Sequence, residues 1–214
     1  TPKSDTDPDD GLTDRLDRKA FGDDVLRLFF ACCHPELNHA EQITMALKVV
    51  AGLTVAEIAR AFLLRPKTLE QRLTRAKRRL AAGRVAFAVP TPAERADRLP
   101  AVTTMIYLIF NEGYSASGGS AHLRAPLCVE AIRLTRWLLL TVPEEPEVMG
   151  LLALLLLQHS RCDARLTTDG QIIPLDAQDR ELWDQQSIAE GCALVEKSLL
   201  RRRPGPLQIQ AAIA

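Results

Sequence analysis

Apolar residues recur along most of this chain at spacings of three and four, which is the period of an amphipathic helix. The pattern begins near Asp23, where the side chains up to Phe30 offer an apolar face. From there it predicts helices near 39–50, 54–62, 66–82, 94–111, 121–141, 145–163 and 178–200, and a further one after Pro206. Leu, Ala and Arg are plentiful while aromatic residues make up only 5%, which also favours helices over sheets. We therefore predict an all-α protein.

Two stretches interrupt the helical pattern. Residues 1–20 are rich in Asp, Pro, Thr and Ser and contain almost nothing to bury, so we expect a disordered linker there, following a domain that has been removed. The stretch 89–92 contains two prolines, each of which disfavours helix in the residue before it. We therefore expect one domain at 21–89 and a second at 90–214, the last helix being cut off at Ala214.

Charge is distributed unevenly along the chain, although the net charge is zero. Residues 31–89 contain ten lysines and arginines against four glutamates, whereas residues 90–214 contain twelve basic and fifteen acidic residues. A basic stretch inside a neutral protein is typical of a DNA-binding module joined to another domain. This pattern predicts a nucleic-acid partner for the first domain.

Cysteine usage argues against a disulfide framework, because the number of cysteines is odd and their spacings are wide. Cys32 and Cys33 precede His34, but a structural zinc site needs about four ligands and no second cysteine pair exists. We therefore predict no metal site and interpret the cysteines as buried or helix-end residues. They are Cys32, Cys33, Cys128, Cys162 and Cys192.

Several functional classes lack support in the sequence. The longest apolar run, 148–157, is too short to cross a bilayer, and no signal peptide is recognisable, so we expect a cytoplasmic protein without a membrane partner. There is no glycine-rich phosphate loop, nucleophile elbow or paired-histidine metal motif, and the four histidines are scattered. We therefore expect neither an enzyme nor a bound cofactor.

The segment 53–80 has the pattern of a helix-turn-helix. Thr54 followed by Glu57 forms a capping box that opens the first helix, and Pro66 suits the start of the second, where its missing amide hydrogen costs nothing. One apolar stripe of the second helix is formed by Leu69, Leu73, Ala76 and Leu80. Its other faces are basic and polar, as expected of a recognition helix that enters the major groove of DNA.

Side chains near the start of a recognition helix reach base edges, and those further along contact phosphates. The predicted base-reading residues are Lys67, Glu70, Gln71 and Thr74. The predicted phosphate-binding residues are Arg72, Arg75, Lys77 and Arg78. The predicted DNA-binding set is completed by Thr54, Arg65 and Thr68.

This segment resembles region 4 of extracytoplasmic-function sigma factors. The family has a leucine, a small residue, two variable residues, glutamate, isoleucine and alanine, followed by a helix that ends in arginine, leucine, a variable residue, arginine, alanine and a basic residue. The chain matches at Leu53, Thr54, Glu57, Ile58, Ala59, Thr68, Arg72, Leu73, Arg75, Ala76 and Lys77. It departs in the turn, where Leu63 stands in place of the usual glycine.

A regulator of the LuxR type is the alternative. Regulators of that type share the opening seen here from Gly52 to Ala59. They usually place valine and histidine in the second helix, where this chain has Leu69 and Arg72. Such a protein would bind a palindrome as a symmetric dimer, with the remaining helices as a sensing domain.

The remainder of the chain resembles the sigma factors that carry a C-terminal tetratricopeptide-like domain of helical hairpins. The matching stretches are 28–35, 109–114, 130–134, 146–153 and 178–180. Nothing matches region 2, so the resemblance implies a fragment that recognises the minus-35 promoter element in double-stranded DNA and contacts the beta flap of the RNA polymerase core. The acidic second domain beside a basic first one suggests a built-in regulator, which either masks the DNA-binding face by an intramolecular contact or docks on polymerase.

Overall fold

The computed structural model of the protein describes residues 24, 27–62, 64–82, 91–115, 125–168 and 171–214. Within these ranges every regular element is a helix, and an isolated antiparallel bridge joins Leu166 to Ile172. The predicted fold class, an all-α chain with a helix-turn-helix followed by a helical part, is confirmed. The expected linker 1–20, the turn residue Leu63 and the first half of the boundary at 89–92 lie outside the described residues.

The N-terminal part is built from helices with strong local start signals. Asn38 and Thr54 each accept a hydrogen bond from the backbone N–H of a glutamate three residues later, and that glutamate accepts one in return, so both helices begin with a capping box. Gly52 has φ +68°, a left-handed conformation that ends the preceding helix and suits glycine. These elements are a helical segment at 27–32, α2 (His39–Val49), α3 (Val55–Ala61) and α4 (Pro66–Ala82).

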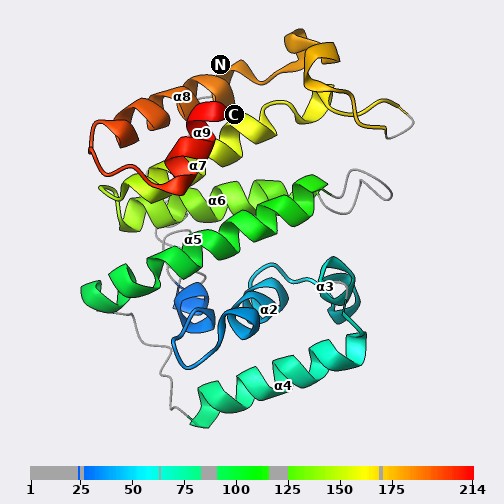
Figure 1. Cartoon of the computed structure of the whole chain (residues 1–214), viewed down its shortest axis with the longest axis vertical. Helices are drawn as coiled ribbons and strands as arrows, with labels where there is room; N and C mark the ends of the chain where they lie inside the picture. Colours follow the sequence, from blue (N-terminus) through cyan, green and yellow to red (C-terminus); the bar gives the residue numbers. More distant parts are fainter. Residues whose placement is uncertain (1–23, 25–26, 63, 83–90, 116–124, 169–170) are drawn as a thin grey trace, which may run out of the picture.

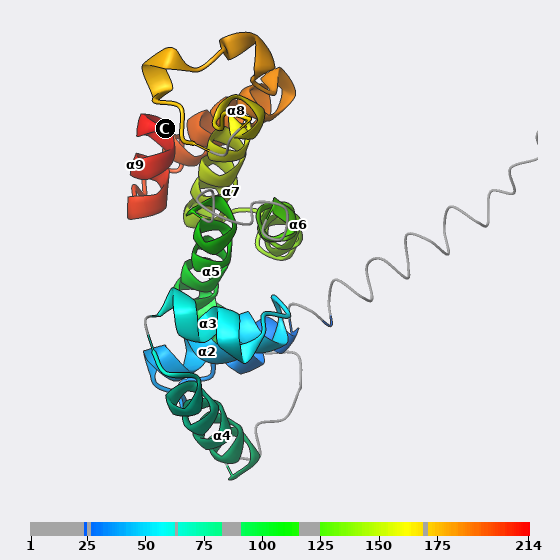
Figure 2. The ribbon, with the colours of Figure 1, turned by 90° about the vertical axis from the view of Figure 1, so that its right-hand side faces the viewer.

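The C-terminal part is arranged around one central helix, α7, on which four other helices pack (Figure 1). Its residues 148–156 are buried, as expected of a helix that is apolar on all sides. In a view turned by 90°, α6 and α9 lie on opposite sides of α7 (Figure 2). The helices are α5 (Pro92–Ser115), α6 (Ala125–Thr141), α7 (Pro146–His159), α8 (Gln185–Leu199) and α9 (Pro206–Ile213).

Helix α5 is longer than the predicted 94–111 at both ends. It begins earlier because Thr91 and Glu94 form reciprocal hydrogen bonds, with the Thr91 N–H donating to the Glu94 carboxylate at 2.8 Å. At the other end the helix continues because tertiary contacts hold its last turn. The Tyr114 ring stacks on Phe110 with centroids 5.4 Å apart, and the Arg165 guanidinium lies 3.7 Å from the centre of the Tyr114 ring.

The connection between α7 and α8 also differs from the prediction. Helix α7 ends at His159, not near 163, and α8 begins at Gln185, not near 178. Three short 3₁₀ turns occupy the intervening segment, at Cys162–Ala164, Leu175–Ala177 and Arg180–Leu182. The start of α8 is set by Asp184, whose carboxylate accepts hydrogen bonds from the backbone N–H groups of the second and third helical residues.

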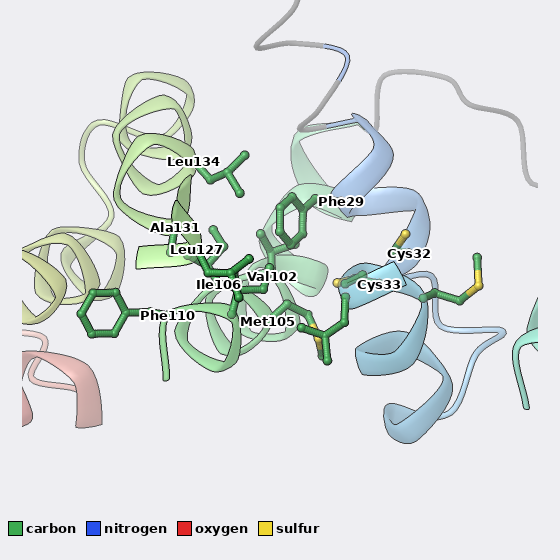
Figure 3. Close-up of a cluster of buried hydrophobic side chains, with 14 of the residues drawn as sticks. Phe29, Cys32, Cys33, Val102, Met105, Ile106, Phe110, Leu127, Ala131 and Leu134 are labelled. Carbon is green, nitrogen blue, oxygen red and sulfur yellow. The ribbon is translucent and has the colours of Figure 1, made fainter. Parts of the chain in front are cut away.

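One apolar core runs through both parts of the chain (Figure 3). Phe29 and Cys33, which precede α2, belong to the same cluster of buried side chains as Val102 and Ile106 of α5. A guanidinium N–H of Arg98 on α5 donates a hydrogen bond to the backbone carbonyl of the residue after Phe29, at 3.3 Å. The predicted 21–89 and 90–214 domains are therefore in direct apolar contact.

The cysteines are all free thiols, and their burial differs. Burial raises the pKa of Cys32 and of Cys128 to about 12 each, and it raises the pKa of Cys33 as well. These three thiols therefore behave as small apolar side chains, as expected. Cys162 is half-buried at a 3₁₀ turn, whereas Cys192 is exposed in the middle of α8, so the interpretation of every cysteine as buried or helix-end is wrong for Cys192.

Gly150 of α7 tests the packing of α7 on α9. A Cβ atom added to Gly150 would lie 2.7 Å from the backbone nitrogen of Gln208, a fully buried residue of α9. We expect Gly150→Ala to lower the free energy of unfolding by about 1–3 kcal/mol in urea denaturation, because a backbone must move. This loss outweighs the higher helix propensity of alanine.

Gly191→Ala is the matched control for this substitution. Its added Cβ would meet the flexible side chain of Leu157 at 2.8 Å and no backbone atom closer than 3.4 Å, so we expect a smaller loss of stability. A Gly150→Ala protein as stable as the unsubstituted chain would contradict the described contact between α7 and α9.

Candidate nucleic-acid interface

The orientation of α4 is set by its apolar stripe. Leu69 and Ala76 are 0% exposed and Leu73 is 6% exposed, while Leu80 is half-buried. These side chains face α2 and α3, the helices on which α4 packs. The stripe predicted from the sequence is therefore buried where α4 meets its neighbours, and the opposite side of α4 faces solvent.

The solvent-facing side of α4 forms one shallow, open depression lined by side chains of four successive turns. All of them are exposed, and all belong to the predicted base-reading and phosphate-binding residues. They are Lys67, Glu70, Gln71, Thr74, Arg75 and Arg78. The structure thus brings most of the predicted DNA-binding set together on one surface, which we call the α4 face.

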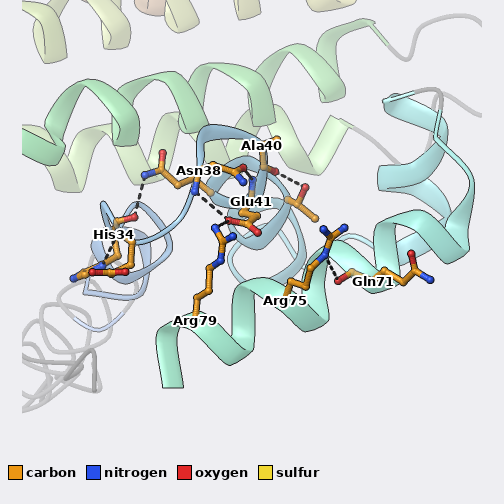
Figure 4. Close-up of polar contacts among 10 residues, drawn as sticks. His34, Asn38, Ala40, Glu41, Gln71, Arg75 and Arg79 are labelled. Atoms are coloured by element: carbon orange, nitrogen blue, oxygen red, sulfur yellow. Dashed lines mark hydrogen bonds and ion pairs between the residues drawn. The ribbon is translucent and has the colours of Figure 1, made fainter. Parts of the chain in front are cut away.

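Two of these side chains are partly ordered by their own helix. The Thr74 hydroxyl donates to the Glu70 carbonyl at 2.9 Å. The Arg75 Nε–H donates to the Gln71 carbonyl at 3.4 Å (Figure 4). The second bond lays the Arg75 guanidinium along the helix surface. An arginine oriented in this way loses less conformational entropy when it binds an anion.

The remaining predicted residues lie outside the α4 face. Arg65, Thr68 and Lys77 are exposed, and Arg72 is half-buried on one flank of the helix. Thr54 is exposed at the start of α3, but its hydroxyl donates to the Glu57 carboxylate at 2.7 Å and accepts from the Glu57 N–H. The visible role of Thr54 is therefore to cap α3.

One polar contact of α4 was not predicted from the sequence. An Nη1–H of Arg79 donates to the Glu41 carboxylate at 2.9 Å, joining the last turns of α4 to the first turn of α2 (Figure 4). The two residues are 38 positions apart, so no local spacing rule links them. The basic run that contains Arg79 gave no sign that this arginine differs from its neighbours.

In the described part of the chain, no three His, Cys, Asp or Glu side chains are arranged to hold a metal ion. No described helix combines the length and the apolar character needed to cross a bilayer. The α4 face offers three cations, one amide, one hydroxyl and one carboxylate to solvent.

Comparison with protein families agrees with this geometry. Residues 30–80 match the family described as sigma-70, region 4, so the helix-turn-helix is a sigma-70 region 4 domain, a class found in transcription factors. Residues 98–199 match a family of unknown function, DUF6596. That match does not identify tetratricopeptide-like repeats, and neither family match supports the LuxR-type alternative.

Comparison with individual proteins gives one strong similarity. The chain is 55% identical over 203 residues to an uncharacterized protein of Rhizobium meliloti (strain 1021), and the match covers 95% of this chain and 48% of that protein. The chain thus spans about half the length of its curated relative. No solved structure matches the chain.

Arg75 provides a test of the α4 face as a phosphate-binding surface. We expect Arg75→Ala to weaken binding to duplex DNA of any sequence and to reduce the slope of log affinity against log salt by about 1, as for one lost phosphate contact. Fluorescence anisotropy with a labelled duplex at several salt concentrations measures both quantities.

Lys197→Ala is the control, because it removes one positive charge from the exposed surface of α8, far from α4 (Figure 1). It should leave the salt slope unchanged. An equal effect of the two substitutions would mean that net charge, and not the α4 face, governs binding.

Proposed function

We propose that this chain is part of a sigma factor and recognises the minus-35 promoter element in double-stranded DNA during bacterial transcription initiation. The observation that carries the proposal is the exposed α4 face on a segment that matches sigma-70 region 4. The resemblance to extracytoplasmic-function sigma factors adds the beta flap of the RNA polymerase core as the protein partner. This role is non-catalytic, needs no cofactor and belongs to the bacterial cytoplasm.

The chemistry of the α4 face suits the major groove, which is about 12 Å wide and admits one helix. The amide of Gln71 can donate to and accept from the edge of an adenine, and Lys67 can donate to the acceptors of a guanine. The carboxylate of Glu70 repels phosphates but can accept from the amino group of a cytosine. These three side chains lie within two turns of the helix start, where base edges come closest.

The phosphate contacts of this proposal fall on both sides of the base-reading residues. Arg75 and Arg78 are exposed further along α4, and Arg72 and Lys77 lie on opposite flanks of the helix. In a major groove both flanks of a recognition helix face a sugar–phosphate strand. The flanking cations therefore supply affinity for any duplex, and the central side chains supply sequence preference.

The C-terminal helices are assigned a regulatory or docking role in this proposal. The packing partners of α4 are α2 and α3, whereas α5 packs against α2 and the segment that precedes it (Figure 1). This attachment leaves the α4 face open to DNA. It favours docking of the acidic C-terminal part on polymerase or another protein over masking of the DNA-binding face.

Selection of bound duplexes from a random library tests the proposal. We expect the chain to select an asymmetric site as a monomer, and the addition of core polymerase to raise its apparent affinity, because the beta-flap contact adds a second attachment. Polymerase core that lacks the flap tip should give no increase. A palindromic site bound by a symmetric dimer without polymerase would instead favour a stand-alone regulator.

Gln71 tests base recognition separately from charge. We expect Gln71→Ala to relax the preference at one or two base pairs of the selected site, at a cost of about 1–3 kcal/mol for the preferred base, while the salt slope stays unchanged. Repeating the selection with the variant measures the preference. An unchanged preference would remove Gln71 from the base-reading residues.

A further inference from the structure

We propose that Arg79 is a positioning residue, whose ion pair with Glu41 sets the angle at which α4 presents its base-reading side chains to DNA. This inference rests on the proposed function, because it assigns to Arg79 a role in sequence recognition. It adds a residue that the predicted DNA-binding set does not contain. In this role the partner of Arg79 is the Glu41 carboxylate and not a phosphate of DNA.

The carboxylate of Glu41, the acceptor in this pair, is held in place by contacts within its own helix. The Glu41 side chain is only 5% exposed, and its Oε2 accepts from the Asn38 backbone N–H at 3.1 Å and from Arg79 Nη1 at 2.9 Å. The Asn38 side chain in turn accepts from the Glu41 N–H at 3.0 Å. The carboxylate is thus part of the capping box of α2, and its oxygen is a fixed point on that helix (Figure 4).

The fixed point on α2 is itself tied to the shared core. Gln42, next to Glu41, donates its side-chain N–H groups to the carbonyls of Cys33 and His34 at 3.3 and 3.1 Å. The segment that ends at these residues packs on α5. The first turn of α2 is therefore held by its capping box and by the hydrogen bonds of Gln42. A guanidinium that binds there is attached to a well-supported part of the molecule.

Arg79 holds the part of α4 that apolar packing holds least. Leu69, Leu73 and Ala76 are buried, but beyond Ala76 the apolar contact comes from the half-buried Leu80. Arg79 lies twelve residues after Lys67, about 18 Å along a helix axis. A tilt of about 3° over that length displaces the far end by about 1 Å, whereas a designed recognition site tolerates about 0.5 Å.

A phosphate contact is the competing role, because the Arg79 side chain is 52% exposed. The two roles predict opposite effects of removing the charge of Glu41. If Arg79 contacted a phosphate of DNA, loss of the Glu41 carboxylate would free the guanidinium and strengthen DNA binding. If the pair positions α4, the same change weakens recognition of the selected site even though it removes a negative charge.

Glu41→Gln is therefore the central variant, and glutamine at this position keeps the capping box, so α2 is preserved. With the full chain, we expect about a fivefold loss of affinity for the selected duplex, the size of a half-exposed charge-assisted contact, and no loss for a scrambled duplex. Arg79→Ala should reduce the affinity for the selected duplex to the same extent, and Arg79→Lys should retain part of that affinity. In all three variants the salt slope should match that of the unsubstituted chain.

Arg78→Ala is the matched control, because it removes the neighbouring arginine from the α4 face. It should weaken binding to the selected and the scrambled duplex equally and reduce the salt slope by about 1. Tighter binding by Glu41→Gln, or a salt slope reduced by about 1 in Arg79→Ala, would overturn the positioning role and leave the proposed function standing. An unsubstituted chain without any sequence preference would instead remove the proposed function, and this inference with it.

Discussion

The burial of one stripe of α4 is the constraint from which the α4 face, the proposed DNA-binding surface, follows. Leu69, Leu73 and Ala76 are spaced by four and three residues, so a helix places all three on one side. Their burial against α2 and α3 leaves a single rotation of α4 about its axis, and that rotation turns Gln71 and Arg75 to solvent. Loss of a buried leucine from such a stripe costs about 2–5 kcal/mol, which is more than any surface contact on the helix supplies.

The shared core gives this small domain a support that its own size does not provide. The part of the chain up to Ala82 is small, and domains of such length bury a modest share of their surface. Phe29 and Cys33 add to them the apolar surface of α5, including Val102 and Ile106. The contact lies on the side of α2 away from the α4 face, so the C-terminal helices can stabilise the domain without covering its exposed cations (Figure 1).

How much the sequence could predict depended on the range of the interactions involved. The starts of α3 and α4 were predicted because Thr54, Glu57 and Pro66 signal them locally, and the exposed side of α4 followed from the apolar period. The last turn of α5 was not predicted, because it depends on a tertiary contact to Arg165. The late start of α8 was also missed, although its cap, Asp184, is a local signal. The ion pair of Arg79 joins residues too far apart in the chain for any spacing rule to connect them.

The basic run at the end of α4 shows why charge alone does not define a DNA-binding surface. Successive residues of a helix point about 100° apart, so neighbouring cations face different surroundings. Arg78 lies opposite the buried stripe and belongs to the α4 face, together with Arg75 one turn earlier. Arg79 is turned toward α2, where the Glu41 carboxylate satisfies it. In the proposed function Arg78, which faces solvent, is available to DNA, whereas Arg79, which the Glu41 carboxylate holds, serves the helix that carries it.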